Sequence, residues 1–330
     1  MDKLLSIVIP TYNMERYLSK CLESLIVSEE LMQVLEILVV NDGSKDSSSQ
    51  IAHEFESKYP QTIRVIDKEN GGHGSAWNRG VEEASGKFLR FLDSDDWLSN
   101  ISAFMRYIAH YDVDLIFSDL NVFYQGENRH KLYSFEVMES ERIYNVNSFD
   151  WMKTNNCFNG YNITNFHVCT YRTSLLKQCH PLFLEKMFYD DEILFVMPLC
   201  RAKSFAYFKG VLYNYLLGRE GQTMDKNIVL RNIDFKIRIR KYEIEYVNSH
   251  PVNVPVIKEK LSYILNSRCN NTITLISNLP YKESRIKMKE WCDYLKCYYP
   301  DFKGGIRYRL YSILPFFAYR IIHEIYKSIK

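Results

Sequence analysis

Short apolar runs alternate with amphipathic segments along the first hundred residues of this chain. The apolar runs are of strand length and are typical of buried strands; they lie at residues 4–9, 34–40, 63–66 and 88–92. Between them, apolar residues recur every three or four positions, which predicts helices at residues 15–28, 47–59 and 74–85. This alternation predicts an α/β fold, with a doubly wound, mostly parallel sheet flanked by helices.

The pattern is less regular after residue 100, although residues 113–118 and 205–208 are still predicted strands. From about residue 225, apolar periodicity predicts three helices separated by prolines, at residues 225–249, 255–278 and 281–297. We therefore predict a boundary near residue 220. It separates an α/β domain over residues 1–220 from a C-terminal helical subdomain over residues 221–330.

Polar clusters directly follow three of the predicted strands. They are Pro10–Asn13, Asn41–Asp46 and Asp93–Asp96. In doubly wound sheets, ligands bind beyond the carboxyl ends of the strands. We therefore expect the three clusters to face one site.

The last of these clusters, Asp93-Ser94-Asp95-Asp96, places three carboxylates within four residues. Like charges so close together need a compensating charge, and carboxylate oxygens suit Mg²⁺ or Mn²⁺. Such a cation could also bridge to a diphosphate. The alternative is a solvated acidic turn that caps a helix beginning near Trp97, and the motif by itself does not decide between the two.

Two further motifs carry candidate chemistry. Asp190 and Asp191 precede a predicted helix, so they could cap it, or one of them could act as a general base. Arg219 lies in a loop that begins at Gly218. Its fork of N–H donors could clamp a departing diphosphate, although most arginines are ordinary surface residues.

Other classes of protein are disfavoured by the sequence. The stretch Gly72-His73-Gly74 continues to Trp77 where a dinucleotide fingerprint requires a third glycine. A nucleotidyltransferase would be expected to carry a glycine-rich, basic loop after the first strand, where this chain has Pro10–Asn13. The net charge of +2 gives no reason to expect nucleic acid as a partner. There is neither a signal-peptide pattern nor an apolar run of membrane-spanning length, so we expect a cytoplasmic protein.

Taken together, the motifs resemble family 2 glycosyltransferases with a GT-A fold, of the kind that assembles bacterial polysaccharides. The resemblance covers roughly residues 1–225 and suggests a nucleotide-sugar half over residues 1–100 and an acceptor half over residues 101–220. It is carried by Ser6–Asn13 (SIVIPTYN), Glu36–Ser44 (EILVVNDGS) with Asp46, Asn70–Gly80 (NGGHGSAWNRG), Gly86, Asp93–Asp96 (DSDD) and Tyr189–Asp191 (YDD).

The resemblance implies a role for each matching residue on the donor side. Asp42 would accept a hydrogen bond from the uracil N–H, and Asp93 would approach the ribose and the donor sugar. Asp95 would coordinate the metal, Mn²⁺ or Mg²⁺, while Asp96 would only start the next helix. The other residues expected to bind the nucleotide sugar are Pro10, Thr11, Tyr12, Asn13, Asn78, Arg79 and Ser94.

The same resemblance implies the catalytic groups. Asp191 would be the general base, preceded by Asp190 where the family usually has Glu. Arg219 and Gln222 would belong to a loop that closes over the diphosphate. Trp151, Tyr161 and His167 are candidates for shaping the acceptor site.

We therefore predict an inverting, metal-dependent glycosyltransferase. It would move a hexose or N-acetylhexosamine from a UDP-sugar to a hydroxyl of a lipid-linked or oligosaccharide acceptor, in the synthesis of a cell-surface polysaccharide such as a capsule. The alternative is a sugar-nucleotide-binding subunit without catalysis. That alternative predicts loss of the catalytic or metal-binding acids, and all of them are present.

The C-terminal segment has the composition of an interfacial helix. Residues 301–330 hold six Lys and Arg and two acidic residues, a net charge of +4, with aromatic residues interleaved. Apolar residues at helical spacing predict an amphipathic tail over residues 304–330, which Pro315 would kink or split. Contact with an anionic membrane would place the protein on the inner face of the plasma membrane. The alternative is that the tail packs on the preceding helices.

Overall fold

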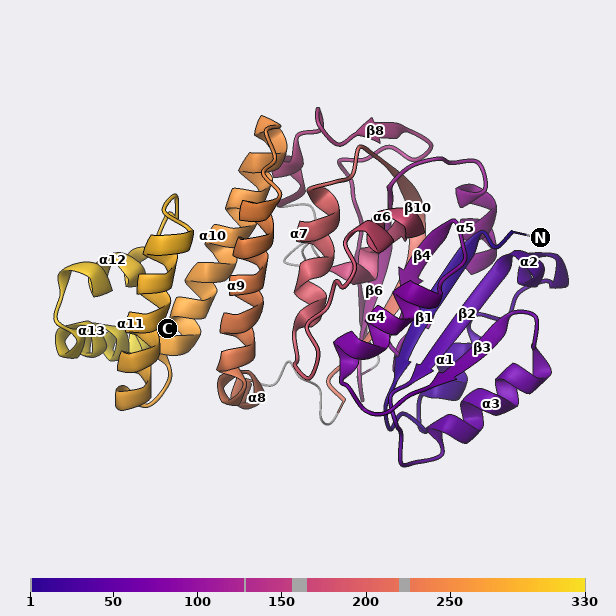
Figure 1. Ribbon diagram of the computed structural model, residues 1–330, viewed down its shortest axis with the longest axis horizontal. Coiled ribbons are helices and arrows are strands. Elements are labelled where there is room, and N and C mark those ends of the chain that lie inside the picture. Colours follow the sequence, from indigo (N-terminus) through magenta and orange to yellow (C-terminus); the bar gives the residue numbers. More distant parts are fainter. Residues whose placement is uncertain (1, 128, 156–164, 220–225, 330) are drawn as a thin grey trace. The chain divides into compact units, whose positions relative to one another are not determined.

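The structure is a computed structural model, which describes residues 2–127, 129–155, 165–219 and 226–329 (Figure 1). The chain forms two compact units, Met1–Gln222 and Thr223–Lys330. The first is an α/β unit and the second contains only helices among its described residues. This architecture confirms the predicted fold class.

The α/β unit is built on one mixed sheet with the strand order β3-β2-β1-β4-β9-β6-β10-β5, while β7 pairs with β6 and β8 pairs with β10. Its first four strands are parallel neighbours, β9 runs antiparallel to β4 and β6, and β6 runs parallel to β10. The strands are β1 Leu5–Thr11, β2 Leu35–Asn41, β3 Ile63–Asp67, β4 Phe88–Phe91, β5 Trp97–Leu98, β6 Leu115–Tyr124, β7 His130–Tyr133, β8 Ile143–Asn145, β9 Cys169–Arg172 and β10 Ser204–Leu217.

Helices connect the strands of this sheet (Figure 1). They are α1 Leu18–Glu23, α2 Glu29–Val34, α3 Ser48–Lys58, α4 His73–Glu83, α5 Ile101–Ile108, α6 Thr173–Gln178 and α7 Ile193–Leu199. The helix predicted over residues 15–28 is wrong in extent. It ends early because Ser24 turns its hydroxyl onto the Cys21 carbonyl at 2.6 Å and accepts the Leu98 N–H at 3.1 Å.

The strand β1 is fully buried, and its pairing with β4 stops before its carboxyl end. Its ladder to β4 ends where the Val8 carbonyl accepts the Leu92 N–H at 3.0 Å. The next residue that faces β4 is Pro10, which has no N–H to donate, so the pairing cannot continue. The chain after β4 is therefore free to turn away from β1 and to present its acidic cluster.

The helix predicted to begin near Trp97 is absent from the structure. Trp97 and Leu98 instead form the short strand β5, which pairs antiparallel with Asn214 and Tyr213 of β10. The next helix, α5, begins only at Ile101. The acidic cluster therefore lies between two strands, where long-range pairing outweighs the local helix signal.

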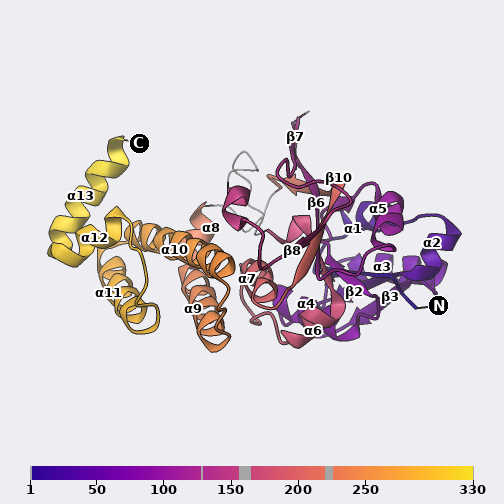
Figure 2. The same ribbon diagram turned by 90° about the horizontal axis from the view of Figure 1, so that it is seen from above.

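The second unit is made of α8 Lys226–Arg231, α9 Ile233–Ser249, α10 Pro255–Ser277, α11 Tyr281–Tyr298, α12 Ile306–Ile313 and α13 Phe316–Ile329. Figure 2 shows α9, α10 and α11 as neighbouring helices. They enclose a core that includes Ile273, Trp291 and Leu295. No helix in the described part of the chain combines the length and apolarity that crossing a bilayer requires.

The C-terminal segment is split at Pro315 into α12 and α13, as the sequence predicted. One face packs inward: Tyr319 is 1% exposed, and Leu310 and Phe316 pack against the same core. Another face is exposed to solvent, with Phe317, Ile321 and Ile325 at helical spacing and 55–61% exposed. The tail therefore has a packed side and a separate exposed apolar stripe.

Candidate active site

The acidic cluster Asp93–Asp96 follows β4 and is tied to β10. Asp96 is 1% exposed, and its carboxylate accepts hydrogen bonds from the Tyr213 hydroxyl and the Leu216 N–H, each at 2.7 Å. The expectation that Asp96 only starts a helix is therefore wrong. Its carboxylate joins the loop after β4 to a strand more than a hundred residues later in the chain.

Asp93, Asp96 and His167 form a group that fits a divalent cation. One ligand atom from each residue lies within 4.8 Å of the others. Burial lowers the pKa of His167 to about 4, so the imidazole is neutral at neutral pH and suited to metal binding. Burial also raises the pKa of Asp96 well above its usual value, and the charges of Asp95 and Asp93 raise it further. Carboxylate oxygen and imidazole nitrogen are donors that Mn²⁺ accepts, and a cation would offset this repulsion.

Asp95, the predicted metal ligand, contacts Arg219. The Arg219 Nε donates to the Asp95 carboxylate, and the two side chains are 17% and 8% exposed. Burial raises the pKa of Asp95, and so does the charge of Asp93, while Arg219 opposes the rise. Two residues predicted for different tasks therefore form one ion pair, and the binding of metal by Asp95 stays a prediction.

The acidic pair Asp190 and Asp191 lies in a single 3₁₀ turn directly before α7. The preceding residue, Tyr189, has a φ of 68°, a left-handed conformation that is costly for a bulky residue. Asp190 is 1% exposed, and Asp191 is partly exposed. Burial raises the pKa of the Tyr215 phenol, and the charges of Asp93–Asp96 and of Asp191 raise it further. The acidic cluster and the acidic pair therefore both lie near Tyr215.

His73, the first residue of α4, links the two acidic groups. Its Nε2 lies 3.3 Å from Asp93 Oδ1, and its Nδ1 lies 3.3 Å from Asp190 Oδ1. Burial lowers the pKa of His73, but the charges and hydrogen bonds of Asp190 and Asp93 raise it well above its usual value. Hydrogen bonds to two carboxylates require an N–H on both ring nitrogens, which is the protonated form. No role for His73 was predicted from the sequence.

Asp42 is held in place by the glycine-rich stretch. It is 3% exposed, and its carboxylate accepts hydrogen bonds from Gly71 N–H at 2.9 Å, Gly72 N–H at 2.8 Å and the Lys68 ammonium at 2.7 Å. The backbone N–H groups of these two glycines therefore bind a carboxylate of the protein itself. The contact of Asp42 with uracil stays a prediction. The uracil N–H would be a fourth donor to this carboxylate.

The loop after β1 lies beside Asp42. Thr11 is 1% exposed, and its carbonyl accepts the Asp42 N–H at 2.9 Å. Tyr12 is 42% exposed, and Asn13 has a left-handed φ of 55°. The Asn13 N–H donates to the Ser44 hydroxyl at 3.1 Å, which ties this loop to the one after β2. The structure thus brings together the first two predicted polar clusters.

Asn78, which is expected near the nucleoside, is bonded to the backbone of Phe183, and its contact with the nucleoside stays a prediction. It is 6% exposed, its Nδ2 donates to the Phe183 carbonyl at 2.9 Å, and its Oδ1 accepts the Phe183 N–H at 3.1 Å. A buried amide held in this way fastens two segments of backbone together. We therefore assign Asn78 to holding the segment that leads to the acidic pair.

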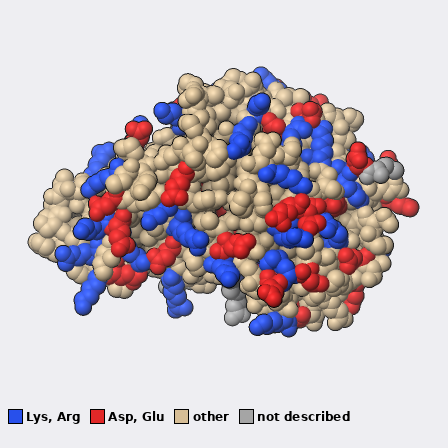
Figure 3. Space-filling view, in the orientation of Figure 1, with Lys and Arg blue, Asp and Glu red and all other residues tan. Residues whose placement is uncertain are grey.

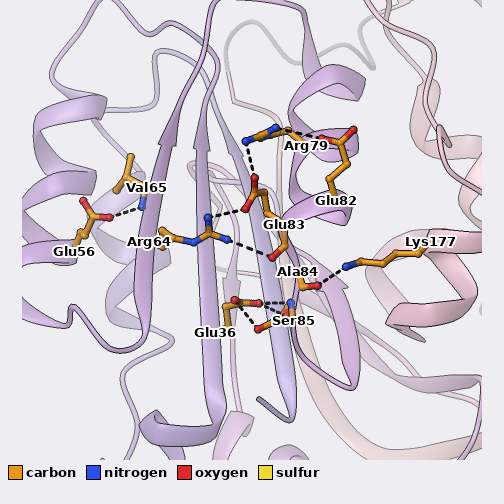
Figure 4. Close-up of polar contacts among 11 residues, drawn as sticks. Glu36, Glu56, Arg64, Val65, Arg79, Glu82, Glu83, Ala84, Ser85 and Lys177 are labelled. Carbon is orange, nitrogen blue, oxygen red and sulfur yellow. Dashed lines mark hydrogen bonds and ion pairs between the residues drawn. The ribbon is translucent and has the colours of Figure 1, made fainter. Parts of the chain in front are cut away.

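Arg79 is also expected near the nucleoside, and that contact likewise stays a prediction. Its side chain is 46% exposed and forms ion pairs with Glu82 at 3.5 Å and Glu83 at 2.6 Å along α4 (Figure 4). These partners lie within the same helix, and Glu83 also pairs with Arg64 of β3 at 2.7 Å. Arg79 therefore belongs to a surface network of charges.

The remaining predicted residues have mixed outcomes. Ser94 is 3% exposed within the acidic cluster. Gln222 and Tyr161 lie outside the described residues. Trp151 is fully buried, and its indole N–H donates to the Val146 carbonyl at 2.9 Å, so it is a core residue and does not shape an acceptor site.

Arg90 is a residue that the sequence analysis missed. It lies fully buried on β4, donates to the Thr170 hydroxyl at 2.8 Å and also donates to the His167 carbonyl. Burial lowers its pKa to about 10, so it remains charged at neutral pH. Arg90 thereby holds the segment before β9 so that His167 lies at Asp93 and Asp96. An arginine within the apolar run Phe88–Leu92 was the available signal.

Charged side chains of both signs lie on the surface. On the face drawn in Figure 3, Lys and Arg are interspersed with Asp and Glu instead of forming one basic patch. This distribution agrees with the net charge of +2.

The model of the family described as "Glycosyl transferase family 2" matches residues 6–180, more than half of the chain. The chain is a family 2 glycosyltransferase. This finding confirms the resemblance on which the sequence analysis relied. The matched residues include the loop after β1, Asp42, His73 and the acidic cluster, whereas the acidic pair and Arg219 lie beyond them.

Curated relatives of this family 2 enzyme are also named as glycosyltransferases or teichoic acid proteins. Glycosyltransferase GlyA of Streptococcus pneumoniae is 34% identical over 153 residues, which are 46% of this chain and 22% of GlyA. The minor teichoic acid biosynthesis protein GgaA of Bacillus subtilis is 32% identical over 231 residues, which are 67% of this chain and 49% of GgaA. The chain thus spans between a fifth and a half of the length of these two relatives.

Solved structures share the fold. TarS 1–349 of S. aureus, in complex with UDP-GlcNAc, has a TM-score of 0.73 at 18% identity and covers 99% of this chain and 92% of its own. The mannosyltransferase PcManGT from Pyrobaculum calidifontis, in complex with GDP-Man and Mn²⁺, has a TM-score of 0.51 at 13% identity, over 98% of this chain and 87% of its own. At these identities the likeness establishes the fold alone.

Proposed function

We propose that this enzyme transfers a hexose or N-acetylhexosamine from a UDP-sugar to a hydroxyl of a saccharide acceptor, with inversion at the anomeric carbon. The observation that carries the proposal is the link through His73, which joins the donor-side carboxylate Asp93 to the acidic pair at Asp190. Direct displacement requires the groups that bind the donor sugar and the general base to lie close together. The UDP-GlcNAc bound to TarS, a protein of the same fold, supports the uridine donor.

The nucleotide would bind at the carboxyl ends of β1 and β2. Asp42, Thr11 and the exposed Tyr12 lie there in adjoining loops. We propose that Asp42 selects uracil by accepting its N–H, since three donors already fix the orientation of this carboxylate. Asp93 would approach the ribose and the sugar.

Asp191 is the proposed general base. It is partly exposed, as a group that meets the acceptor must be, whereas its neighbour Asp190 is buried against His73. A hydroxyl is a weak nucleophile, so proton removal during attack accelerates transfer. Attack from the face opposite the leaving diphosphate inverts the anomeric configuration.

A divalent cation, Mn²⁺ or Mg²⁺, would be held by the acidic cluster, with Asp93, Asp96 and His167 as the group within reach and Asp95 as the ligand implied by the family. When bound, it would supply positive charge to the leaving diphosphate. Arg219 would supply a second positive charge once its guanidinium turns from Asp95 to the phosphates.

The acceptor is proposed to be lipid-linked, in the synthesis of a cell-surface polysaccharide such as a capsule or teichoic acid. The name of the relative GgaA supports that setting. The exposed stripe of Phe317, Ile321 and Ile325, with a segment charge of +4, would bind the anionic inner face of the plasma membrane. The enzyme would then work on acceptors held at that surface.

A panel of nucleotide sugars tests this function directly. Purified enzyme is incubated with each UDP-sugar and an acceptor lipid extract, with Mn²⁺ or with EDTA, and released UDP is measured. We expect one or a few UDP-sugars to be turned over, and only with the cation. Release of GDP from a GDP-sugar, or full activity in EDTA, would contradict the donor or the metal assignment respectively.

A further inference from the structure

His73 lies at the junction of the two halves of the site. It is the first residue of α4, and its ring contacts Asp93, which follows β4, and Asp190, which precedes α7. Asp190 is 117 residues away along the chain. The ring also packs on Trp77, with centroids 4.1 Å apart, and Trp77 is fully buried. The imidazole is thus fixed on three sides.

We propose that His73 is a positioning residue for sugar transfer, which holds the Asp190–Asp191 turn against Asp93 and so sets the distance between the base and the donor. The inference rests on the proposed function, because it takes Asp191 as the base. His73 would act through the two carboxylates and would not touch the reacting atoms, since both ring nitrogens are already engaged.

The acidic turn needs such a support because its backbone is strained. Tyr189 and Lys186 have left-handed φ values of 68° and 56°. Conformations of this kind cost about 1–3 kcal/mol each and persist only where surrounding contacts impose them. The Lys186 N–H donates to the Gly71 carbonyl at 2.9 Å, and Asn78 holds Phe183. These contacts fix the backbone before the turn.

The Asp190 side chain is held by fewer contacts than the backbone that precedes the turn. Among the described residues its Oδ1 is bonded to His73, and its Oδ2 is buried without a hydrogen-bond partner. A Cβ at Gly74 would come within 2.4 Å of that Oδ2. Because Gly74 has no side chain, Asp190 can approach α4, where its carboxylate is hydrogen-bonded to His73. The orientation of this carboxylate depends on the imidazole.

This arrangement predicts a particular kinetic defect. Without His73, the nucleotide loops and Asp42 are unchanged, so UDP should still bind. The acidic turn would lose its tie to Asp93, so the base would meet the acceptor less often in the right geometry. Loss of an outer partner of this kind typically costs about 10–100-fold in activity. We expect that loss in kcat, with the Kd for UDP changed less than about threefold, an order-of-magnitude bound.

The test compares His73→Gln and His73→Ala with a matched control, His53→Gln. His53 also lies between two carboxylates, Glu56 and Asp67, each at 2.8 Å, but on the exposed surface of α3. We expect kcat to fall for both His73 variants, with UDP affinity by calorimetry and thermal melting close to wild type, and His53→Gln to behave as wild type. Unchanged kcat in both His73 variants would overturn the proposal, as would a fall in kcat matched by an equal loss of UDP affinity.

A double variant separates this inference from the proposed function. If His73 acts through Asp190, the variant His73→Gln with Asp190→Asn should have the kcat of the worse single variant, whereas independent effects would multiply. Multiplied effects would overturn the positioning role. Asp191→Asn is measured in parallel. Normal turnover by that variant would show that Asp191 is not the base. If Asp191→Asn loses turnover while His73→Gln keeps the wild-type kcat, only the inference about His73 is overturned.

Discussion

The guanidinium of Arg219 lies against the carboxylate of Asp95, a residue 124 positions earlier in the chain. From the sequence, the two residues are predicted to have different partners, a metal ion and a diphosphate. The structure joins them at the carboxyl end of the sheet, with both side chains largely buried. The buried guanidinium of Arg219 can thus balance part of the negative charge of the acidic cluster.

Substituting Asp95 should remove the response to metal. We expect Asp95→Asn to lower kcat by at least about a hundredfold, the cost of removing one group that stabilises transition-state charge. Added Mn²⁺ should no longer restore activity, and Mn²⁺ titration followed by electron paramagnetic resonance should detect weaker binding. The measurement is UDP release across a series of Mn²⁺ concentrations.

The matched control for this variant is Asp112→Asn. Asp112 also pairs with an arginine, Arg172 at 2.8 Å, but it is 78% exposed on the surface. Its loss should leave metal activation unchanged. Full Mn²⁺ activation in Asp95→Asn would show that Asp93, Asp96 and His167 suffice, and would end the predicted role of Asp95.

Asp191→Asn should separate binding from chemistry. The amide keeps the size of the carboxylate but cannot take a proton, so we expect UDP-sugar to bind normally while transfer falls about 10²–10⁴-fold, as for loss of a general base. Binding is measured by calorimetry and transfer by product formation. Turnover near the wild-type rate would remove Asp191 as the base.

Asn78→Ala should lower stability and leave nucleotide recognition intact. Asn78 makes two buried hydrogen bonds to the backbone of Phe183, and removing them leaves a buried N–H and carbonyl unpaired. We expect a loss of about 2–6 kcal/mol in the free energy of unfolding, at about 1–3 kcal/mol for each of the two buried groups. Denaturant unfolding measures the loss, and the folded variant should bind UDP within about threefold of wild type, an affinity difference below about 0.7 kcal/mol.

Arg79→Ala is the neighbouring control. Its ion pairs are exposed, so its stability should change by no more than about 0.5 kcal/mol. UDP affinity should also be unchanged. A large loss of UDP affinity in either variant would restore the nucleoside contact that the sequence predicted.

Local patterns sufficed to predict the strand ends and their polar clusters. The apolar runs end within two residues of the ends of β1, β2 and β4, and parallel strands bring such ends to one edge. The roles of Asn78 and Arg90 could not be predicted in this way. Asn78 bonds a backbone 105 residues later, and Arg90 depends on β9, an antiparallel strand inserted between β4 and β6. Such partners follow from tertiary pairing, which periodicity does not encode.

Asp96 illustrates the same limit within a motif that was recognised. A carboxylate before apolar residues is a common start of a helix, so the local interpretation favoured a cap. The pairing of Trp97 and Leu98 with β10 instead draws Asp96 onto Tyr213. The position of Asp96 in the cluster therefore depends on β10, a strand that begins at Ser204.

The C-terminal stripe should bind anionic membranes through residues that do not hold the fold together. Removing the whole segment would be a poor test, because Tyr319 lies in the core of the helical unit. Ile321 and Ile286 offer a matched pair, since each is 59% exposed, the first on α13 and the second on α11. Burying one isoleucine in lipid contributes about 1.5–3 kcal/mol, so Ile321→Ser should weaken binding to vesicles about tenfold or more.

The measurement is flotation with vesicles of phosphatidylcholine, with or without phosphatidylglycerol. Wild type should bind the anionic vesicles and release as ionic strength rises, because the segment carries +4 while salt screens exposed charges. Ile286→Ser should bind as wild type does. Equal flotation of Ile321→Ser and wild type would exclude the stripe as the membrane contact. If wild type bound equally well to vesicles with and without phosphatidylglycerol, the basic residues would not contribute to membrane binding.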